Sequence, residues 1–354
     1  MMPPPSCIDV LDVVKYPLDH AFSTRLDAFS GLLHPRLAHN HASSTHQRAD
    51  HTMTTTTKVR KAVIPAAGLG TRMFPATKAI KKEMFPIVTP DGVCKPLIHN
   101  ILDEAAAAGA EDFAIIVRPG DEKIFGDYFS ATAPDYFDRL GAAARQQAER
   151  IADLARHITY IHQEQQLGFG HALHGTQNWV GNDPFLLLVG DHIYFSYAAK
   201  PSAAQLTECF ASQDGASVIS LYQAPGQDVH HYGTVCGTWL PNSANTLRLT
   251  RFVEKPNLDF ARQHLAMPGL PDDTFLCVYG QYVLTPDIFP ILAEHVAKGN
   301  RQKGEIQLTP ALDELRQQQG MLGFIVDGEH YDTGQPFAYV DSLAAYAASA
   351  RKHA

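Results

Sequence analysis

Short apolar runs alternate with longer segments of helical composition from Lys58 onward. Lys58–Pro65, Phe113–Val117 and Phe185–Val189 are rich in apolar and β-branched residues, as is typical of strands buried on both faces. Two further runs, Ile158–His162 and Ser217–Gln223, are also predicted as strands. The helices predicted between the strands are Pro96–Ala108, residues 134–155, Gly168–Trp179 and residues 203–213. This alternation predicts βαβ units, a mostly parallel sheet and helices on both of its faces.

The pattern changes between residues 229 and 285, where strands follow one another without long helices. Tyr232–Trp239, Thr246–Val253 and Phe275–Leu284 fit hairpins or an antiparallel edge. The last part predicts helices at residues 286–298 and 308–319, a strand at Ile325–Asp332 and a closing helix at Phe337–Ala350. The predicted fold class is therefore α/β, with a Rossmann-like, mixed and mostly parallel sheet flanked by helices and a small antiparallel extension. Ligands of such sheets lie outside the carboxyl ends of the strands, so the residues that follow strands are the candidates for chemistry.

Residues 1–57 differ in composition from the rest of the chain. They hold six of the 18 histidines, three consecutive prolines and the run Thr54–Thr57, with little periodicity. Asp9, Asp12 and Lys15 interrupt any apolar core of a secretory signal. We expect a disordered leader, or an extension upstream of Met53 as the working initiator. A histidine-rich regulatory or metal-binding arm is the alternative, but spacings such as His39-x-His41 lack cysteine or carboxylate support.

Composition and charge narrow the class of protein. A length of 354 residues suits about two domains or one large α/β unit, and 45% hydrophobic residues suffice for a sizeable core. The net charge of −8 argues against nucleic acid as a partner, although a local pocket can still be basic enough for small anions. Five scattered cysteines without a C-x-x-C pair indicate reduced thiols and a cytoplasmic protein. No run of 18 apolar residues occurs, so no membrane partner is expected.

The first predicted strand runs into a glycine loop, Gly68-Leu69-Gly70-Thr71-Arg72, and Lys82 follows ten residues later. Glycines allow backbone N–H groups to surround an anion, Arg72 offers a planar fork for phosphate oxygens, and Lys82 offers a point charge. A glycine turn alone is commonly structural, but together with two cations it predicts an anion site. The G-K-[ST] of a Walker A loop and the third glycine of the dinucleotide fingerprint are missing. No acidic residue follows a second strand about 20 positions on, so an NAD-binding protein is disfavoured.

The stretch Val63–Ile80, VIPAAGLGTRMFPATKAI, followed by KEMFP at Lys82–Pro86, closely resembles bacterial UTP–glucose-1-phosphate uridylyltransferases, a branch of the sugar-phosphate nucleotidyltransferases. The resemblance covers about residues 58–350. It implies that UTP and α-D-glucose 1-phosphate are joined into UDP-glucose and pyrophosphate with the help of Mg²⁺. It also implies one nucleotidyltransferase domain at 58–354, mainly nucleotide-binding over 58–228 and mainly sugar-binding over 229–334, with a C-terminal helix at 335–354. The oligomeric state, including a homo-oligomer, stays open.

The resemblance also implies residue roles on the nucleotide side. Gln163 and Gly168 are expected to read the uracil edge together with Ala67, because a pyrimidine needs one amide side chain and close backbone contacts. The alternative for Gly168 is the start of a helix. The full set of expected nucleotide-binding residues is Ala66, Ala67, Gly68, Leu69, Gly70, Thr71, Gln163 and Gly168.

Catalytic, metal and sugar residues follow from the same resemblance. Asp191 ends the most apolar run and Asp332 follows a late strand; carboxylates suit Mg²⁺, although a lone aspartate at a strand end is commonly a cap. The resemblance pairs these two as the metal ligands. It also implies that Gly233 and Glu254 meet glucose hydroxyls. The residues expected to carry catalysis are Arg72, Lys82, Asp191 and Lys255, and no histidine is needed as a base, because the attacking phosphate is already an anion.

Four departures from the family pattern leave the base and the sugar open. Lys81 stands where many relatives have proline, Thr89–Cys94 is a short insertion, and Gln335-Pro336 lacks a common lysine. Gly190-Asp191 is closer to the thymidylyltransferase branch. The alternatives are therefore another sugar-1-phosphate nucleotidyltransferase, such as a thymidylyltransferase, or a catalytically silent sugar-nucleotide sensor. The presence of both predicted loop cations and Asp191 disfavours the sensor.

Overall fold

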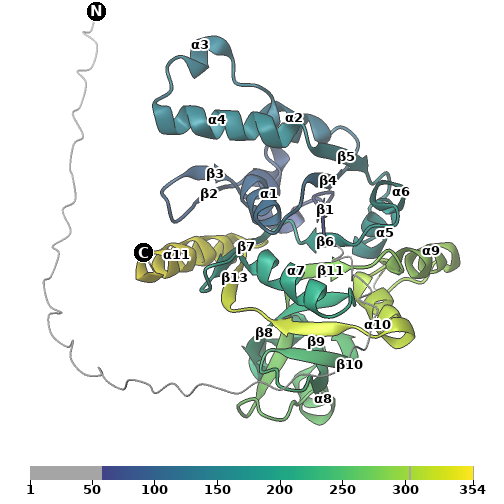
Figure 1. The fold of residues 1–354 in the computed structure, drawn as a ribbon. Helices are drawn as coiled ribbons and strands as arrows, with labels where there is room; N and C mark the ends of the chain where they lie inside the picture. Colours follow the sequence, from purple (N-terminus) through teal and green to yellow (C-terminus); the bar gives the residue numbers. More distant parts are fainter. Residues whose placement is uncertain (1–57, 303, 354) are drawn as a thin grey trace, which may run out of the picture. The chain divides into compact units, whose positions relative to one another are not determined.

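A nine-stranded mixed sheet forms the centre of the fold (Figure 1). The computed structural model describes residues 58–302 and 304–353, so the predictions for residues 1–57, including Met53 as initiator, lie outside the described residues. The strands lie in the order β5 (Ile158–His162), β4 (Asp112–Val117), β1 (Lys61–Pro65), β6 (Phe185–Leu188), β11 (Thr274–Leu284), β8 (Val218–Pro225), β12 (Leu322–Ile325), β10 (Thr246–Glu254) and β9 (Gly233–Trp239).

Most strands of this sheet point the same way. β5, β4, β1 and β6 are mutually parallel. β11 is antiparallel to β6, β8 and β9, whereas β12 is parallel to β8. β10 is antiparallel to both β12 and β9. Only β11 and β10 therefore run against the other seven strands of the sheet, and the predicted mixed, mostly parallel α/β fold is confirmed.

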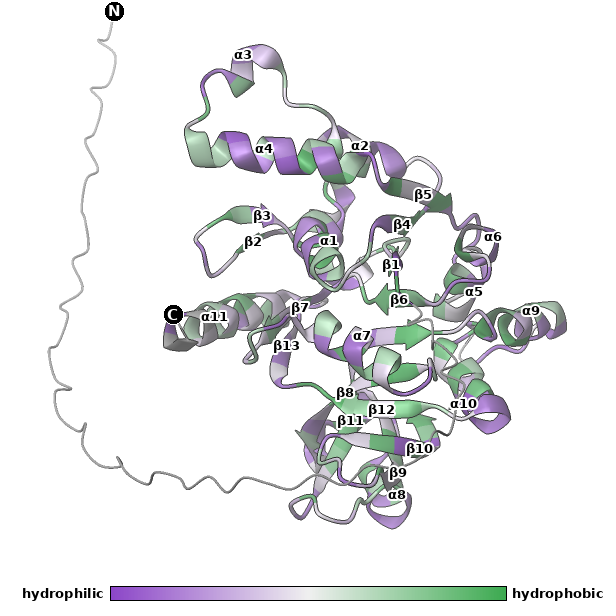
Figure 2. Cartoon of the chain, in the orientation of Figure 1, coloured by the Kyte–Doolittle hydropathy of each residue, from purple (hydrophilic) through white to green (hydrophobic). Residues whose placement is uncertain are grey.

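Helices cover the two faces of the sheet over separate cores. Alternate residues of β1 serve the two cores, with Ala62 and Ile64 in one and Val63 in the other. The first core is covered by α1 (Leu97–Ala107), α2 (Glu122–Phe129), α7 (Ser202–Ser212) and α11 (Pro336–His353). The second is covered by α5 (Phe169–His174), α9 (Ile288–Lys298) and α10 (Leu308–Gln319). Figure 2 shows the central strands as mainly hydrophobic, as burial on both faces requires.

Smaller elements complete the described chain. The 3₁₀ turn η4 (Gly226–His231) and α8 (Leu258–His264) cover a third, small core. β7 (His192–Ser196) pairs with β13 (Gly328–Asp332) in a separate ribbon, against which α11 packs. β2 (Pro86–Val88) and β3 (Cys94–Pro96) form a hairpin, and short 3₁₀ turns lie at η1 (Thr71–Met73), η2 (Ala76–Lys78) and η3 (Lys82–Met84). Among the described helices, none is long and apolar enough to cross a membrane.

Three predicted elements are each divided in two. The helix predicted over 134–155 is α3 (Pro134–Phe137) and α4 (Ala142–Ala155), because Gly141 takes an extended backbone conformation. The helix predicted over Gly168–Trp179 is α5 and α6 (Gln177–Val180). The strand predicted over Ile325–Asp332 is β12 and β13, which belong to different sheets. The chain leaves the main sheet at Asp327, whose N–H and C=O bond to Gln205 and Tyr197.

Helix α1 buries a histidine that links stability to pH. His99 is only 1% exposed, with Nδ1 2.8 Å from the Tyr128 hydroxyl and Nε2 3.4 Å from Asp103 Oδ2. Burial lowers the pKa of His99 from 6.5 to about 4, although the Asp103 carboxylate acts in the opposite direction. The folded protein therefore keeps this imidazole neutral over a pH range in which the unfolded chain is already protonated.

We expect His99 to make the fold less stable as pH falls from 6.5 toward 4. The unfolded chain binds the proton first, so between pH 7 and 5 this residue should remove about 2 kcal/mol from the free energy of unfolding. Urea unfolding of the wild type and of His99→Asn at both pH values measures the effect, since asparagine does not titrate and can still accept from Tyr128. The variant should lose about 2 kcal/mol less than the wild type; an equal loss would contradict the prediction.

Candidate functional site

Two adjoining cavities open beside the carboxyl ends of β1 and β6. The first, of about 470 Å³, is lined by the glycine loop and by residues that follow β5 and β6. The second, of about 450 Å³, is lined by the start of β9, the end of β10 and the segments before α10 and α11. Phe169 and Val189 line both. The cavities lie where an open α/β sheet places its ligands.

The glycine loop presents unused backbone donors to the first cavity. The last paired backbone amide before the loop is that of Ala66, which donates to Ile116 O on β4 at 2.7 Å. Within the described part of the chain, the next four N–H groups donate to no protein group: Ala67, Gly68, Leu69 and Gly70. Ala67 is buried, whereas Gly68 and Leu69 are exposed, and a run of successive N–H groups can form an anion-binding nest. The loop is therefore arranged for an anionic ligand.

Glycine is required at one position of this loop. Gly70 has φ 64°, and a Cβ there would lie 2.8 Å from Thr77 Cγ2. The Thr77 hydroxyl also donates to Gly70 O at 2.9 Å, which ties the loop to the next 3₁₀ turn. A side chain at position 70 would force these two segments apart.

Lys82 and Asp191 meet at the edge of the first cavity, with Lys82 Nζ 2.6 Å from Asp191 Oδ2. A Cβ on Gly190 would lie 2.3 Å from Pro65 O, so only glycine lets the chain after β6 approach the end of β1. Burial alone would raise the pKa of Asp191, but the charge and hydrogen bond of Lys82, together with the neighbouring His192 and a backbone hydrogen bond, hold this pKa below its ordinary value. Burial likewise opposes the charge of Lys82, yet Asp191 and Glu83 raise the pKa of its ammonium. Both groups are ionised at neutral pH.

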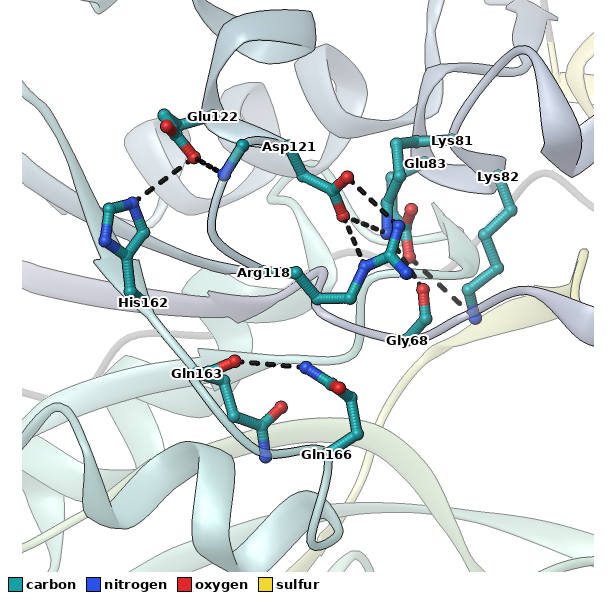
Figure 3. Close-up of polar contacts among 11 residues, drawn as sticks. Gly68, Lys81, Lys82, Glu83, Arg118, Asp121, Glu122, His162, Gln163 and Gln166 are labelled. Carbon is teal, nitrogen blue, oxygen red and sulfur yellow. Dashed lines mark hydrogen bonds and ion pairs between the residues drawn. The ribbon is translucent and has the colours of Figure 1, made fainter.

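Glu83 is a buried carboxyl beside this pair. Its side chain is 1% exposed, and neither carboxylate oxygen has a hydrogen-bond partner among the described residues. The nearest cation is Lys82, whose Nζ lies 4.0 Å from Glu83 Oε1 (Figure 3). Burial raises the pKa of Glu83 to about 7, although Lys82 and Lys81 lower it. The charge of this part of the cavity wall therefore changes near neutral pH.

Gln163 and Gly168 form another wall of the first cavity. Gln163 Nε2 donates to Gly168 O at 3.1 Å, and Gln166 Nε2 donates to Gln163 O at 3.0 Å (Figure 3). Gly168 has φ 109°, and a Cβ there would lie 2.7 Å from Ile306 O. The segment around Ile306 is packed directly against this loop, since Ile306 N donates to Leu167 O at 2.7 Å. An amide side chain and close backbone thus stand side by side, as recognition of a planar base requires.

The second cavity is lined by both acidic and basic side chains. Glu254 faces Gly233 across the β10–β9 pair, and its Oε2 accepts from the Thr309 hydroxyl at 2.6 Å. Lys255 turns out of β10 with φ 46°, and its Nζ lies 3.9 Å from Glu254 Oε1. Arg72 lines the same cavity. These groups can bind a polar ligand that carries hydroxyl groups and an anion.

Asp191 and Asp332 come together across the β7–β13 ribbon. Thr333 donates to Asp191 O through both its N–H, at 2.9 Å, and its hydroxyl, at 2.7 Å. A Cβ on Gly334 would lie 3.0 Å from Asp332 Oδ1 and 3.1 Å from Asp191 Oδ2, so the two carboxylates flank one point. No group of three or more metal-ligating side chains occurs within the described residues. A hard cation held between these two carboxylates, beside Gly334, would need further oxygens from its ligands to complete its shell.

The structure brings the predicted residues together with one exception. Ala66 is 1% exposed, lines neither cavity and has its amide paired, so it is placed behind the site. Arg72 lies with the second cavity rather than with the glycine loop of the first. The other predicted residues line the first cavity (Ala67, Gly68, Leu69, Gly70, Thr71, Lys82, Gln163, Gly168 and Asp191) or the second (Gly233, Glu254, Lys255 and Asp332).

Sequence reasoning missed several residues that line the second cavity. They include His192, His230 and His231, since the sequence indicated only that no histidine is needed as a base. His192 directly follows Asp191, and His230 and His231 lie just before Gly233. Their position beside predicted site residues was the available signal.

Comparison with known proteins agrees with this geometry. The profile described as nucleotidyl transferase matches residues 61–349. A UTP–glucose-1-phosphate uridylyltransferase of Staphylococcus epidermidis is 36% identical over 294 residues, which cover 82% of this chain and 93% of that protein. The UTP–glucose-1-phosphate uridylyltransferase 2 of Staphylococcus saprophyticus is 35% identical over 292 residues, with 82% and 92% covered.

Solved structures give the same picture. A UDP-glucose pyrophosphorylase complexed with UDP-glucose has a TM-score of 0.67 at 29% identity, covering 82% of this chain and 99% of that one. A UTP-bound UGPase from Acinetobacter baumannii has a TM-score of 0.64 at 26% identity, with 81% and 93% covered. The likeness extends over nearly the whole of each of these proteins.

Proposed function

The chain belongs to the nucleotidyl transferase family, and on that premise we propose that it transfers a uridylyl group from UTP to α-D-glucose 1-phosphate, giving UDP-glucose and pyrophosphate. The observation that carries the proposal is the pair of adjoining cavities with Asp191 and Asp332 between them. A loop of free amides lines one cavity, and Glu254 and Lys255 line the other. Relatives named for this reaction, at 36% and 35% identity, support the choice of substrates.

The first cavity is assigned to UTP. The four free amides of the glycine loop bind the triphosphate, and Lys82 neutralises charge at the α-phosphate. Gln163 and the Gly168 backbone read the uracil edge, with Ala67 on the same wall. This division assigns mainly residues 58–228 to the nucleotide, with Glu305 as a lining residue from a later segment.

The second cavity is assigned to glucose 1-phosphate. Glu254, oriented by the Thr309 hydroxyl, accepts from sugar hydroxyls beside the Gly233 backbone. Lys255 and Arg72 contact the phosphate of glucose 1-phosphate and the phosphates of UTP that leave as pyrophosphate. Residues 229–334 supply most of this cavity, and α11 supplies Ala338.

Asp191 and Asp332 fit a magnesium ion, because both are carboxylates and both face one point. Asp191 and Asp332 would hold the ion, which would supply positive charge to offset that of the phosphates. Lys82 donates to Asp191 Oδ2 in the same place, which keeps that carboxylate ionised and oriented. The donor set thus agrees with the metal that the family resemblance implies.

The reaction then needs positioning and charge rather than a base. An oxygen of the sugar phosphate attacks the α-phosphorus of UTP in line, and pyrophosphate leaves on the opposite side. The sugar phosphate is already anionic, so no imidazole has to remove a proton and no covalent enzyme intermediate forms. The cations Arg72, Lys82 and Lys255 stabilise the charge that two approaching polyanions bring together.

A pyrophosphate-release assay tests the proposed function directly. UTP, dTTP, ATP and GTP are crossed with glucose 1-phosphate, galactose 1-phosphate and N-acetylglucosamine 1-phosphate in the presence of Mg²⁺. We expect UTP with glucose 1-phosphate to give the highest kcat/KM, because an amide and close backbone select the pyrimidine. A higher kcat/KM with dTTP would assign the chain to the thymidylyl branch, and no release with any pair would support a silent sensor.

Removing a predicted catalytic cation should slow turnover strongly while the fold persists. For Lys82→Ala and Arg72→Ala we expect kcat to fall by about 10²–10³-fold, the usual cost of one electrostatic contact to a transition state. Lys123→Ala is the matched control, since its side chain is 77% exposed and pairs only with Asp127 on α2. Circular dichroism checks that each variant is folded. A wild-type kcat in either site variant would contradict the catalytic role assigned to the substituted residue.

Removing either carboxylate should change the response to magnesium. We expect Asp191→Asn and Asp332→Asn to need at least tenfold more Mg²⁺ for half-maximal rate, because each removes an anionic ligand. Asp332→Asn is the cleaner variant, since it leaves the Lys82–Asp191 contact in place. Mg²⁺ titrations of initial rate measure the effect, and unchanged titrations in both variants would refute the assignment.

A further inference from the structure

A second network of charges lies behind the glycine loop, outside the proposed substrate contacts. Lys81 is only 6% exposed, and its Nζ donates to Gly68 O at 2.8 Å and lies 3.0 Å from Asp121 Oδ2. Arg118 holds the same carboxylate with a two-pronged contact, Nε at 2.7 Å and Nη2 at 3.0 Å. Figure 3 shows the Lys81 and Arg118 side chains both reaching the Asp121 carboxylate, with Gly68 close by. The neighbouring lysines thus have different partners, since Lys82 bonds to Asp191.

The network is anchored in the sheet. Arg118 directly follows β4, and Asp121 directly precedes α2, whose Phe125 and Phe129 are fully buried in the first core. Asp121 N also donates to Arg118 O at 3.0 Å and closes the turn between them. Burial alone would raise the pKa of Asp121, but Arg118 and Lys81 more than offset it, so this pKa lies below its ordinary value. An ionised carboxylate on a rigid turn therefore holds the Lys81 ammonium in place.

The contact with Gly68 decides which way one peptide group faces. The Gly68–Leu69 bond is trans, so its C=O and N–H point in opposite directions. Holding the Gly68 oxygen toward Lys81 therefore turns the Leu69 N–H to the other side of the loop. Leu69 lines the first cavity, and its N–H has no partner among the residues that the structure describes. Because glycine has little barrier to other backbone conformations, this orientation needs an external anchor.

We propose that Lys81, held by Asp121 and Arg118, is a positioning residue that turns the Leu69 amide toward the nucleotide phosphates. This inference rests on the proposed function, because it assumes that the first cavity binds a nucleoside triphosphate. Lys81 does not touch substrate; it acts through the Gly68–Leu69 peptide. Its loss frees that peptide to rotate, so one of the four phosphate donors is no longer preorganised.

The test compares ligand binding in variants of the full chain. Lys81→Met keeps the length of the buried stem and removes the ammonium, and Asp121→Asn removes the anchoring charge. Lys81→Pro is a second variant, because Lys81 has φ −62°, which proline adopts, and its N–H donates no hydrogen bond to the described residues. Lys123→Met is the matched control, on the surface of α2. Calorimetry gives Kd for UTP and for inorganic tripolyphosphate, and kinetics give KM for each substrate.

We expect Lys81→Met and Lys81→Pro to raise Kd for UTP and for tripolyphosphate about tenfold, which is about 1.4 kcal/mol, with KM for glucose 1-phosphate within about twofold of wild type. Asp121→Asn should act in the same direction, and the Lys81→Met/Asp121→Asn double variant should be no weaker than Lys81→Met alone, because the residues act as one unit. Lys81→Arg should recover binding.

Two results would overturn the proposal. One is unchanged Kd for both ligands in folded Lys81→Met; the other is an equal rise of both KM values with a lower Tm, which indicates a merely structural role. Failure of the proposed function is separate, since the wild type would then release no pyrophosphate from UTP and glucose 1-phosphate. Tripolyphosphate binding still decides the role of Lys81 in that case, because it depends on neither base nor sugar.

Discussion

The close packing of the ends of β1 and β6 is the constraint on which the rest of the site depends. A Cβ at Gly190 would lie 2.3 Å from Pro65 O, so the ends of these parallel strands approach this closely only because this residue is glycine. One loop carries the free amides and the other carries Asp191. Lys82 joins the two through its contact with Asp191 Oδ2. Any side chain at position 190 would separate the donors from the carboxylate.

Several charged side chains lie around the carboxyl ends of β1 and β6. Lys82 and Asp191 line the first cavity, and the Lys81–Asp121–Arg118 network lies behind the loop. The buried carboxyl of Glu83 lies 4.0 Å from Lys82 and has no hydrogen-bond partner among the described residues. A chain with net charge −8 can in this way present a local cationic surface to polyanions, because its cations are concentrated where the strands end.

Much of the fold could be predicted from the sequence wherever one apolar pattern runs along the whole element. Ile158–His162 agrees with β5 at both ends, and residues 308–319 agree with α10, because apolar periodicity follows directly from burial. Prediction failed where a tertiary contact ends an element. The run Ile325–Asp332 has a continuous strand composition, yet Asp327 bonds to Gln205 and Tyr197 and the chain changes sheets. The short elements β7, α8 and the β2–β3 hairpin had no period long enough to detect.

The sequence by itself determined the alternation of strands and helices, the glycine loop with its cations and the motifs that indicate the family, because these are local patterns set by burial and backbone freedom. Tertiary structure alone decided which groups meet. Thr333 lies 142 positions from Asp191 in the chain, and only the β7–β13 ribbon brings Asp332 to the same point. It also decided that Arg72 lines the second cavity and that Lys81 reaches Asp121. Such distances depend on how strands order themselves in a sheet, and no local pattern of residues encodes them.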